Sequence, residues 1–242
     1  IKHTLGIGDV GLDIGTQTIA ISSNSDVKIY ELADRVQNIE NQKRILLRKI
    51  GRSRRSNNPN NYNEDGTIKK QGSKKVIWIK SNKYIKTQNK LKELYRKQAD
   101  IRKLQHERLA NEILKQGDNI YVETMNYAGL QKRSIKTEKN DKGKFKKKKR
   151  FGKSLANKAP STLLSIVDRK LKYHDRQLIK IDTYSVKASQ YNHFDKTCTK
   201  KPLSQRWNDF NGIKIQRDMY SAFLIMNINS DLKTINIDKC ND

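Results

Sequence analysis

The chain has 242 residues and a formal net charge of +27, because 52 Lys and Arg stand against 25 Asp and Glu. Only 34% of its residues are hydrophobic, and no stretch approaches the roughly 20 apolar residues that a membrane-spanning helix needs. The two cysteines, Cys198 and Cys240, are too few for a disulfide framework and indicate a reducing compartment. So large a positive charge favours nucleic acid over an anionic membrane as the partner, with a coding bias toward Lys, Asn and Ile as the alternative explanation.

Three strands are predicted at the start of the chain. Residues 10–15 (VGLDIG) alternate apolar residues with Gly and Asp, which is the period-two pattern of a strand with one apolar face. Residues 18–22 and 27–32 continue as two further strands of a meander, with a polar turn at 23–26. Asp13 therefore lies on the less apolar face of the first strand.

A basic helical hairpin is predicted after these strands. Residues 34–50 and 81–116 carry apolar residues at helical spacing, and Lys and Arg fill their other faces. Residues 56–75 are rich in Asn, Gly and Ser, so we expect a loop there. Two helices joined by such a loop can pack as an antiparallel pair.

One further strand and a strongly basic segment come next. Residues 119–125 (NIYVETM) form a short, nearly apolar strand that carries one acid, Glu123. Residues 132–153 contain twelve Lys or Arg and two acids. We interpret this run as mobile in isolation and ordered on nucleic acid, with a solvated insert as the alternative.

The last third of the chain is predicted to contain two helices and one strand. Helices are expected at 160–173 and 217–228 and a strand at 178–183, while residues 185–212 are irregular and aromatic. Asp218 falls in the first turn of the last helix. The order of all the elements predicts a mixed α/β sheet flanked by helices, as in an RNase H-like fold.

Three acids lie in apolar elements, where burying a carboxylate costs free energy. Asp13 and Glu123 interrupt apolar strands, and Asp218 begins an apolar helix. A buried carboxylate needs a compensating partner, which Lys or Arg could provide in so basic a chain. A pair of divalent cations is the other possible partner, because two-metal phosphoryl chemistry uses several converging carboxylates.

Small residues accompany these acids. We expect Gly11 and Gly15, which flank Asp13, to leave room beside it for an ion and a phosphate. Ala222 lies one turn after Asp218, so we expect the last helix to approach the sheet closely.

Residues 11–17 (GLDIGTQ) also resemble the first phosphate-binding loop of sugar kinases in the actin-like ATPase superfamily. Those kinases need a second domain and later Gly-rich adenosine motifs, whereas this chain has only 12 Gly in all. The strongly basic charge also argues against a kinase.

Four segments carry a second, broader resemblance. Residues 11–16 (GLDIGT), 121–130 (YVETMNYAGL) and 217–227 (RDMYSAFLIMN) are similar to the first, second and third RuvC motifs of the TnpB proteins. Residues 94–114 resemble the basic helix that precedes the second motif. TnpB proteins are the OrfB-type "transposases" of insertion sequences and are relatives of type V CRISPR effectors. The resemblance covers nearly the whole chain, but only the C-terminal portion of a complete family member.

This resemblance implies a DNA endonuclease with a RuvC active site, guided by RNA in its complete form. Asp13, Glu123 and Asp218 would be the catalytic residues and would hold two Mg²⁺ ions, for which Mn²⁺ can substitute. The implied partners are a DNA substrate and a guide RNA, with no membrane and no small-molecule substrate. The implied location is a prokaryotic cytoplasm, at the nucleoid when bound.

The motifs also imply a domain organisation. The expected segments are RuvC part I at 1–33, a basic helical insert at 34–116, RuvC part II at 117–184 with a basic loop at 131–158, a degenerate zinc-ribbon-like insert at 185–216, and RuvC part III with the tail at 217–242.

Phosphate contacts are expected from the basic segments, and binding through them weakens steeply with salt. The candidates are Arg52, Arg54, Arg55, Arg96, Lys97, Arg102, Lys103, Lys132, Arg133, Lys146, Lys147, Lys148, Lys149, Arg150 and Arg217. Arg217 is adjacent to Asp218, so either stabilisation of transition-state charge or pairing with an acid is expected of it.

This chain departs from the family at the segment where members usually carry a zinc ribbon. Structural zinc takes four ligands, usually two Cys-x-x-Cys pairs in this family, but the region offers only Cys198 with His193 nearby. We therefore expect no zinc, or a ribbon replaced by aromatic packing. The aromatic residues concerned are Tyr191, Phe194, Trp207 and Phe210.

The N-terminal recognition and wedge-like domains of the family are also expected to be absent, because the chain starts at the first motif. Two other functions therefore stand beside the nuclease. One is a catalytically inactive nucleic-acid-binding module, such as an RNA-guided repressor or a decayed remnant. The other is a structural protein that packs nucleic acid.

Overall fold

The computed structural model of the chain describes residues 4–69, 72, 75–132, 135–141, 143, 151–202, 204–210 and 212–241. The chain divides into two compact units. The first unit combines Ile1–Ala33 with Gln105–Asp242, and the second unit is Asp34–Leu104. The second unit is thus inserted into the sequence of the first.

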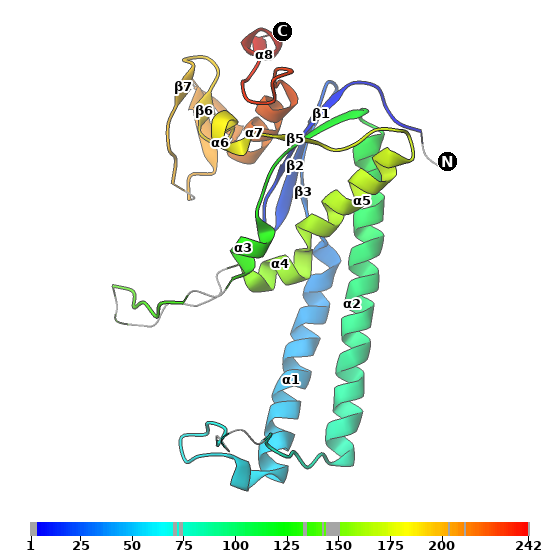
Figure 1. Cartoon of the computed structure of the whole chain (residues 1–242), viewed down its shortest axis with the longest axis vertical. Coiled ribbons are helices and arrows are strands. Elements are labelled where there is room, and N and C mark those ends of the chain that lie inside the picture. Colours follow the sequence, from blue (N-terminus) through cyan, green and yellow to red (C-terminus); the bar gives the residue numbers. More distant parts are fainter. Residues whose placement is uncertain are drawn as a thin grey trace. The chain divides into compact units, whose positions relative to one another are not determined.

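A five-stranded sheet is the centre of the first unit (Figure 1). Its strands are β1 (Asp9–Ile14), β2 (Thr18–Ser23), β3 (Val27–Glu31), β4 (Asn119–Glu123) and β5 (Ile179–Ile181). The order across the sheet is β3-β2-β1-β4-β5. β1, β2 and β3 form an antiparallel meander, whereas β4 runs parallel to β1 and β5 runs parallel to β4. The predicted mixed α/β class with a mixed sheet is confirmed.

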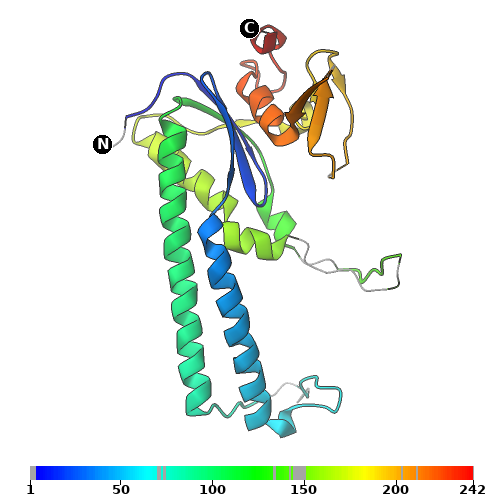
Figure 2. The same cartoon turned by 180° about the vertical axis from the view of Figure 1, so that it is seen from behind.

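Helices cover both faces of this sheet. α5 (Pro160–Lys172) packs on one face together with residues 105–114, the last turns of α2 (Asn82–Leu114). α7 (Arg217–Met226) packs on the other face, and Figure 2 shows it across the sheet from α5. The remaining helices of the unit are α3 (Tyr127–Gln131), α4 (Gly152–Lys158), α6 (Thr183–Val186) and α8 (Ile237–Asn241).

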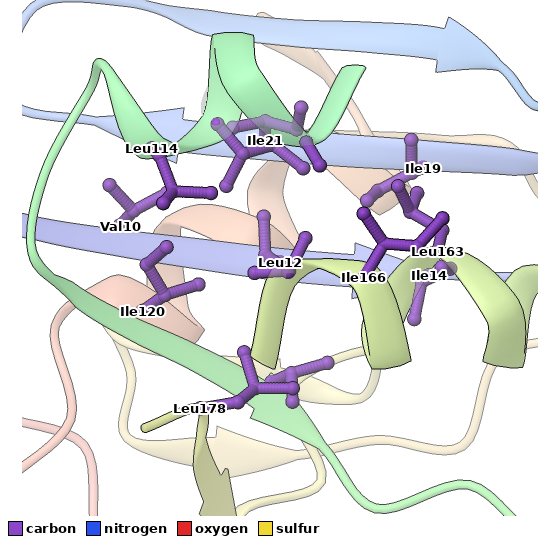
Figure 3. Packing of buried hydrophobic residues seen from close by; sticks show 14 of the residues in the cluster. Val10, Leu12, Ile14, Ile19, Ile21, Leu114, Ile120, Leu163, Ile166 and Leu178 are labelled. Carbon is purple, nitrogen blue, oxygen red and sulfur yellow. The ribbon is translucent and has the colours of Figure 1, made fainter. Parts of the chain in front are cut away.

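The main hydrophobic core lies between the sheet and α5, and it follows from the alternation in the strands. Val10, Leu12 and Ile14 of β1 point toward α5, where they meet Leu163 and Ile166 (Figure 3). Because side chains alternate across a strand, Gly11 and Asp13 lie on the opposite face, toward α7. The pattern that buries the core therefore also aims Asp13 at the last helix.

Leu163→Ala tests the position of this core. The Leu163 side chain is fully buried, so its truncation leaves a cavity, and we expect the free energy of unfolding to fall by about 2–5 kcal/mol. Leu104→Ala is the matched control, because Leu104 is 52% exposed, and its cost should stay below about 1 kcal/mol. Urea unfolding of both variants checks this, and equal costs would contradict the assigned core.

Residues 185–212 are more regular than predicted. They include β6 (Tyr191–Asn192), which pairs with β7 (Thr197–Cys198), and β8 (Trp207–Phe210), which pairs with β9 (Ile213–Gln216) just after this segment; both pairs are antiparallel. The prediction of an irregular segment is wrong because strands of two to four residues are too short to show a clear period.

The predicted aromatic packing of this segment is confirmed for three of its four residues. The ring centroids of Phe194 and Phe210 lie 5.3 Å apart, and that of Phe210 lies 4.8 Å from Tyr220 of α7. Tyr191 packs against the same buried cluster. Trp207 is 58% exposed, so the prediction that it packs with the others is wrong.

His193 and Cys198, the residues nearest to a zinc-ligand pair in this segment, have different surroundings. The His193 ring is buried, and its Nδ1 lies 2.6 Å from the hydroxyl oxygen of Tyr220. Burial also lowers the pKa of His193, because it disfavours the charged ring. Cys198 is exposed on β7 as a free thiol.

The second unit is a helical hairpin. α1 (Gln37–Asn57) and α2 run side by side (Figure 1), and α1 continues seven residues beyond its predicted end at residue 50. Lys43 of α1 is buried and donates to Glu40 at 3.0 Å and to Gln98 of α2 at 2.8 Å. This hydrogen-bonded lysine helps to hold the two helices together.

Among the described residues, no helix has an apolar stretch of the length that a bilayer span requires.

Candidate active site

The strand register places two of the predicted acids side by side. Leu12 of β1 pairs with Val122 of the parallel strand β4, so Asp13 and Glu123 follow directly at the carboxyl ends of neighbouring strands. Both acids lie one position after a residue of the buried α5 face, and both therefore face α7. Two carboxylates thus meet at one edge of the sheet.

The first turn of α7 brings the third acid to the same place. Gln216 caps the helix by accepting the Met219 backbone N–H at 2.7 Å, and Asp218 follows in the first turn. The charge of Asp218 acts on Asp13 across the space between helix and sheet. Asp13 therefore interacts with both other acids, although the three come from distant parts of the sequence.

A glycine contact fixes how closely α7 lies on the sheet. A β-carbon at Gly11 would overlap the carbonyl oxygen of Ala222 and the backbone nitrogen of Met226. The close approach expected from Ala222 is therefore confirmed. The expectation that Gly11 leaves room for an ion and a phosphate is wrong, because helix backbone fills that space. Gly15 has a more open environment, since a β-carbon added there would meet the Thr18 carbonyl oxygen first, at 3.6 Å.

Burial and like charge act together on Asp13. The pKa of its carboxyl is raised to about 8, first by burial and then by the neighbouring charges of Glu123 and Asp218. The guanidinium of Arg217 and a hydrogen bond from the Ser221 hydroxyl oppose this rise. An additional positive charge at this position would favour the ionised carboxylate.

The pKa of Glu123 is also raised. Burial raises the pKa of its carboxyl to about 7, while a hydrogen bond from the Ala188 backbone N–H works against the rise. Ala188 is fully buried just after α6, whose first turn is capped by Asp182. The short helix α6 thus helps to orient Glu123.

These two carboxyl groups predict that stability falls as pH rises in the absence of divalent cations. An unfolded chain loses both protons near pH 4, whereas the folded protein retains them until about pH 7 for Glu123 and about pH 8 for Asp13. Between these limits the folded state binds more protons, so raising the pH favours unfolding. We expect Glu123→Gln to remove up to about 1.4 kcal/mol per pH unit from the slope of unfolding free energy between pH 5 and 7. Urea unfolding at several pH values in EDTA measures this slope, and parallel curves for the two proteins would contradict it.

Asp218 is engaged by two arginines. Its Oδ1 lies 3.4 Å from Nε of Arg217, and its Oδ2 lies 3.7 Å from Nη1 of Arg206. Gln216 also donates to Oδ2 at 3.1 Å. Arg217 is itself buried, and its Nη1 donates to the Pro202 carbonyl at 3.4 Å. Of the two roles expected for Arg217, pairing with an acid is the one that these contacts favour.

The carboxylate oxygens of the three acids are the type of ligand that a hard divalent cation binds. Carboxylate oxygens are the ligands that Mg²⁺ and Mn²⁺ prefer, and mutual repulsion of the three acids would be relieved by a cation. In the part of the chain that the structure describes, however, no three Asp, Glu, His or Cys side chains stand close enough to hold a metal ion. Asp218 would therefore have to leave Arg206 and Arg217 in order to join Asp13 and Glu123 around an ion.

Sequence patterns alone did not identify three neighbours of the acids. Ser221 lies three residues after Asp218 on the same helix face, so helical spacing could have revealed it. Ala188 contributes only its backbone, which no sequence pattern marks. The Tyr127 hydroxyl is buried without a hydrogen-bond partner among the described residues, and burial together with the Asp13 charge raises the pKa of this phenol.

A cleft of about 710 Å³ opens beside Glu123. Its walls come from the end of β4, from α5 and from β5, and they include Tyr127, Ser165, Lys172 and Lys180. This cleft therefore lies next to one of the two acids whose pKa is raised.

The predicted basic residues have varied surroundings, and those from Arg52 to Lys103 lie on the two helices of the hairpin. Arg54 and Arg55 lie over the rings of Trp78 and Tyr62, at 4.9 and 5.6 Å from the ring centroids. Arg96 pairs with Glu93 at 3.0 Å and with Asp100 at 3.1 Å. Arg52, Lys97, Lys103 and Lys132 are exposed, and Arg102 is half-buried. The remaining candidates, Arg133, Lys146, Lys147, Lys148, Lys149 and Arg150, lie outside the described residues.

No protein-family model and no curated protein matches this chain. Among solved structures, the chain is similar to the mini-RNA-guided endonuclease CRISPR-Cas phi3, with a TM-score of 0.38 and 10% sequence identity. The match covers 88% of this chain but 43% of that one, so this chain spans less than half the length of that solved chain. The likeness is weak at this TM-score and carries no information about function.

Proposed function

We propose that this chain is the catalytic portion of a metal-dependent DNA endonuclease of the TnpB/OrfB type, guided by RNA in its complete form. We further infer an RNase H-like fold, with RuvC parts at 1–33, 117–184 and 217–242 and inserts at 34–116 and 185–216. Asp13, Glu123 and Asp218 are its catalytic residues.

The observation that carries the proposal is the electrostatic interaction of Asp13 with both other acids. The three acids come from β1, β4 and α7, and Asp13 responds to the charges of both other acids. Neighbouring like charges with little access to solvent destabilise a fold, and acids of this kind are concentrated at functional sites. Their interaction therefore favours an active site over a structural role. The net charge of +27 independently favours a polyanionic substrate.

Two Mg²⁺ or Mn²⁺ ions held by these acids would activate a water molecule and stabilise the leaving oxygen of a phosphodiester. The chain's own groups prepare that site. The Ala188 N–H donates to Glu123, and Arg217 pairs with Asp218 at 3.4 Å. The Ser221 hydroxyl donates to the Arg217 carbonyl at 2.9 Å and helps to lower the pKa of Asp13. Close packing of Gly11 against Ala222 sets the distance between Asp218 and the sheet.

Zinc is not part of this proposal. The buried His193 ring already bonds the Tyr220 hydroxyl, and the rings of Phe194, Phe210 and Tyr220 pack together in this segment and on α7. Aromatic burial would then take over the role of the structural ion in fixing this insert.

A catalytically inactive nucleic-acid-binding module is the second candidate. The observation that favours it is the pairing of Asp218 with Arg206 and Arg217, which neutralises this acid without a metal. In such a module these ion pairs would be permanent, and divalent cations would bring no cleavage.

Metal-dependent cleavage distinguishes the two functions. The 242-residue chain is incubated with end-labelled single-stranded DNA in Mg²⁺, in Mn²⁺ or in EDTA. Single strands are used because they need no duplex opening. The nuclease proposal expects cleavage with either ion and none in EDTA, whereas salt-dependent binding without cleavage in any buffer would support the inactive module.

A further inference from the structure

A second polar cleft lies within the helical hairpin and contains none of the proposed catalytic acids. It has a volume of about 920 Å³ and lies between the end of α1 and the start of α2. Five cationic side chains line it, which are Lys49, Arg52, Lys83, Lys86 and Lys90. Its other lining residues are Ser, Thr and Asn, and none is acidic.

The cations form two rows that face each other across the cleft. Lys49 and Arg52 lie one turn apart on α1, while Lys83, Lys86 and Lys90 occupy one face of α2 at helical spacing. All five side chains belong to exposed residues. None of them forms an ion pair with any residue that the structure describes.

Hydrogen bonds between small polar residues form the floor of the cleft. Asn57 donates to the Ser53 carbonyl at 2.6 Å, and its amide also lies 3.4 Å from the hydroxyl of Ser81. The hydroxyls of Ser53 and Ser81 lie 3.4 Å apart, so α1 and the start of α2 are joined directly. This network fixes the separation of the two cationic rows before any ligand binds.

Five cations without a described acidic partner, placed around a preformed cleft, destabilise the hairpin by mutual repulsion, since like charges at helical spacing repel each other. An anion long enough to contact several of these cations would offset their repulsion. The row from Lys83 to Lys90 extends about 10 Å along the helix, which corresponds to about two or three consecutive phosphates of one strand. An extended phosphate chain therefore suits the cleft better than a single small anion.

We propose that this cleft binds the phosphodiester backbone of a single nucleic-acid strand, independently of the catalytic acids. Lys49 and Arg52 contact the backbone from one side, and Lys83, Lys86 and Lys90 contact it from the other. Base identity is not read, because the lining offers charges to phosphates and little else. Arg54 and Arg55 are not part of the site, since both stack on aromatic rings at the tip of the hairpin.

The test compares two triple variants of the full chain that remove the same charge. The cleft variant is Lys83→Gln/Lys86→Gln/Lys90→Gln, and glutamine keeps the helix propensity close to that of lysine. The control variant is Lys200→Gln/Lys214→Gln/Lys233→Gln, three exposed lysines outside the cleft. Binding of labelled 20-nucleotide RNA and DNA single strands is measured in EDTA over a range of salt concentrations.

We expect the cleft variant to bind about tenfold more weakly than the control at about 0.1 M salt, with a salt slope smaller by about 2 in log–log units. Thermal melting without ligand should show no loss of stability, because repulsion between lysines has been removed. The RNA and DNA arms show which kind of strand is the stronger ligand.

Two results would overturn the proposal. If both variants bind the strands equally more weakly than the unaltered chain, the loss of binding reflects net charge and not the cleft. Unchanged binding in the cleft variant would mean that the strand lies elsewhere. A further arm uses vesicles of anionic phospholipid, and binding of vesicles without binding of either strand would assign the cleft to a membrane instead.

Failure of this proposal can be told apart from failure of the nuclease proposal. Binding is measured in EDTA, where no cleavage is expected, and the same comparison can be made in a Glu123→Ala background. If the unaltered chain shows no Mg²⁺- or Mn²⁺-dependent cleavage but keeps cleft-dependent binding, the nuclease proposal alone is rejected.

Discussion

Glu123→Ala is expected to lower Mg²⁺-dependent cleavage of single-stranded DNA by about a thousandfold or more. Charge stabilisation at a metal site contributes several kcal/mol to the transition state, and about 4 kcal/mol corresponds to a thousandfold in rate. Glu123 is the acid whose carboxyl accepts from the Ala188 backbone N–H and whose residue borders the cleft of about 710 Å³. Its removal should therefore abolish the site rather than weaken it.

Glu112→Ala is the matched control for this substitution. Glu112 is exposed on α2 and pairs only with Lys115 at 3.0 Å among the ion pairs of the described residues, so its loss should leave cleavage unchanged. Misfolding can be excluded by thermal melting at pH 8 in EDTA, where Glu123→Ala removes an unfavourable buried charge and should not lower the melting temperature. Equal cleavage by Glu123→Ala and the unaltered chain would point to a contaminating nuclease.

Gly11→Ala is expected to destabilise the first unit by about 3 kcal/mol or more. The added methyl group would meet the backbone of α7 at Ala222 and Met226, and backbone cannot move aside as a side chain can. The helix must lift from the sheet, so Asp218 moves away from Asp13. We therefore expect cleavage to be lost even at temperatures where the variant remains folded.

Gly15→Ala provides the comparison for Gly11→Ala. An added methyl group there makes only an ordinary contact with Thr18, at 3.6 Å, so a change within about 0.5 kcal/mol is expected. Urea unfolding and cleavage are measured for both variants. Similar stabilities for the two would show that α7 does not rest on Gly11.

The central sheet could be predicted from the sequence because its strands follow a simple rule. Alternation at residues 10–15 separates a core face from a polar face. This rule places the Asp13 side chain on the face of the strand opposite to that of Leu12. The approach of α7 was also predictable, since Ala222 is small and lies one turn after Asp218. Local patterns of this kind are enough where one face of an element is buried.

Other features depend on contacts between distant segments and could not be predicted. The role of Gly11 is an example, because the same glycine could leave space for an ion or for a helix, and only the packing of α7 decides between them. Ala188 supports Glu123 through its backbone, which all residues share. The exposure of Trp207 likewise depends on how β8 and β9 pair, and strands of four residues show little pattern.

Binding of Mn²⁺ tests most directly whether Asp13, Glu123 and Asp218 act together as one metal-holding site. Titration followed by electron paramagnetic resonance counts bound ions without requiring activity. The proposal predicts two ions for each chain and their loss in Asp13→Asn, whereas the control Glu112→Gln retains both. Absence of tight Mn²⁺ binding, or equal binding in Asp13→Asn, would contradict the account and leave Asp218 as an acid paired with Arg206 and Arg217.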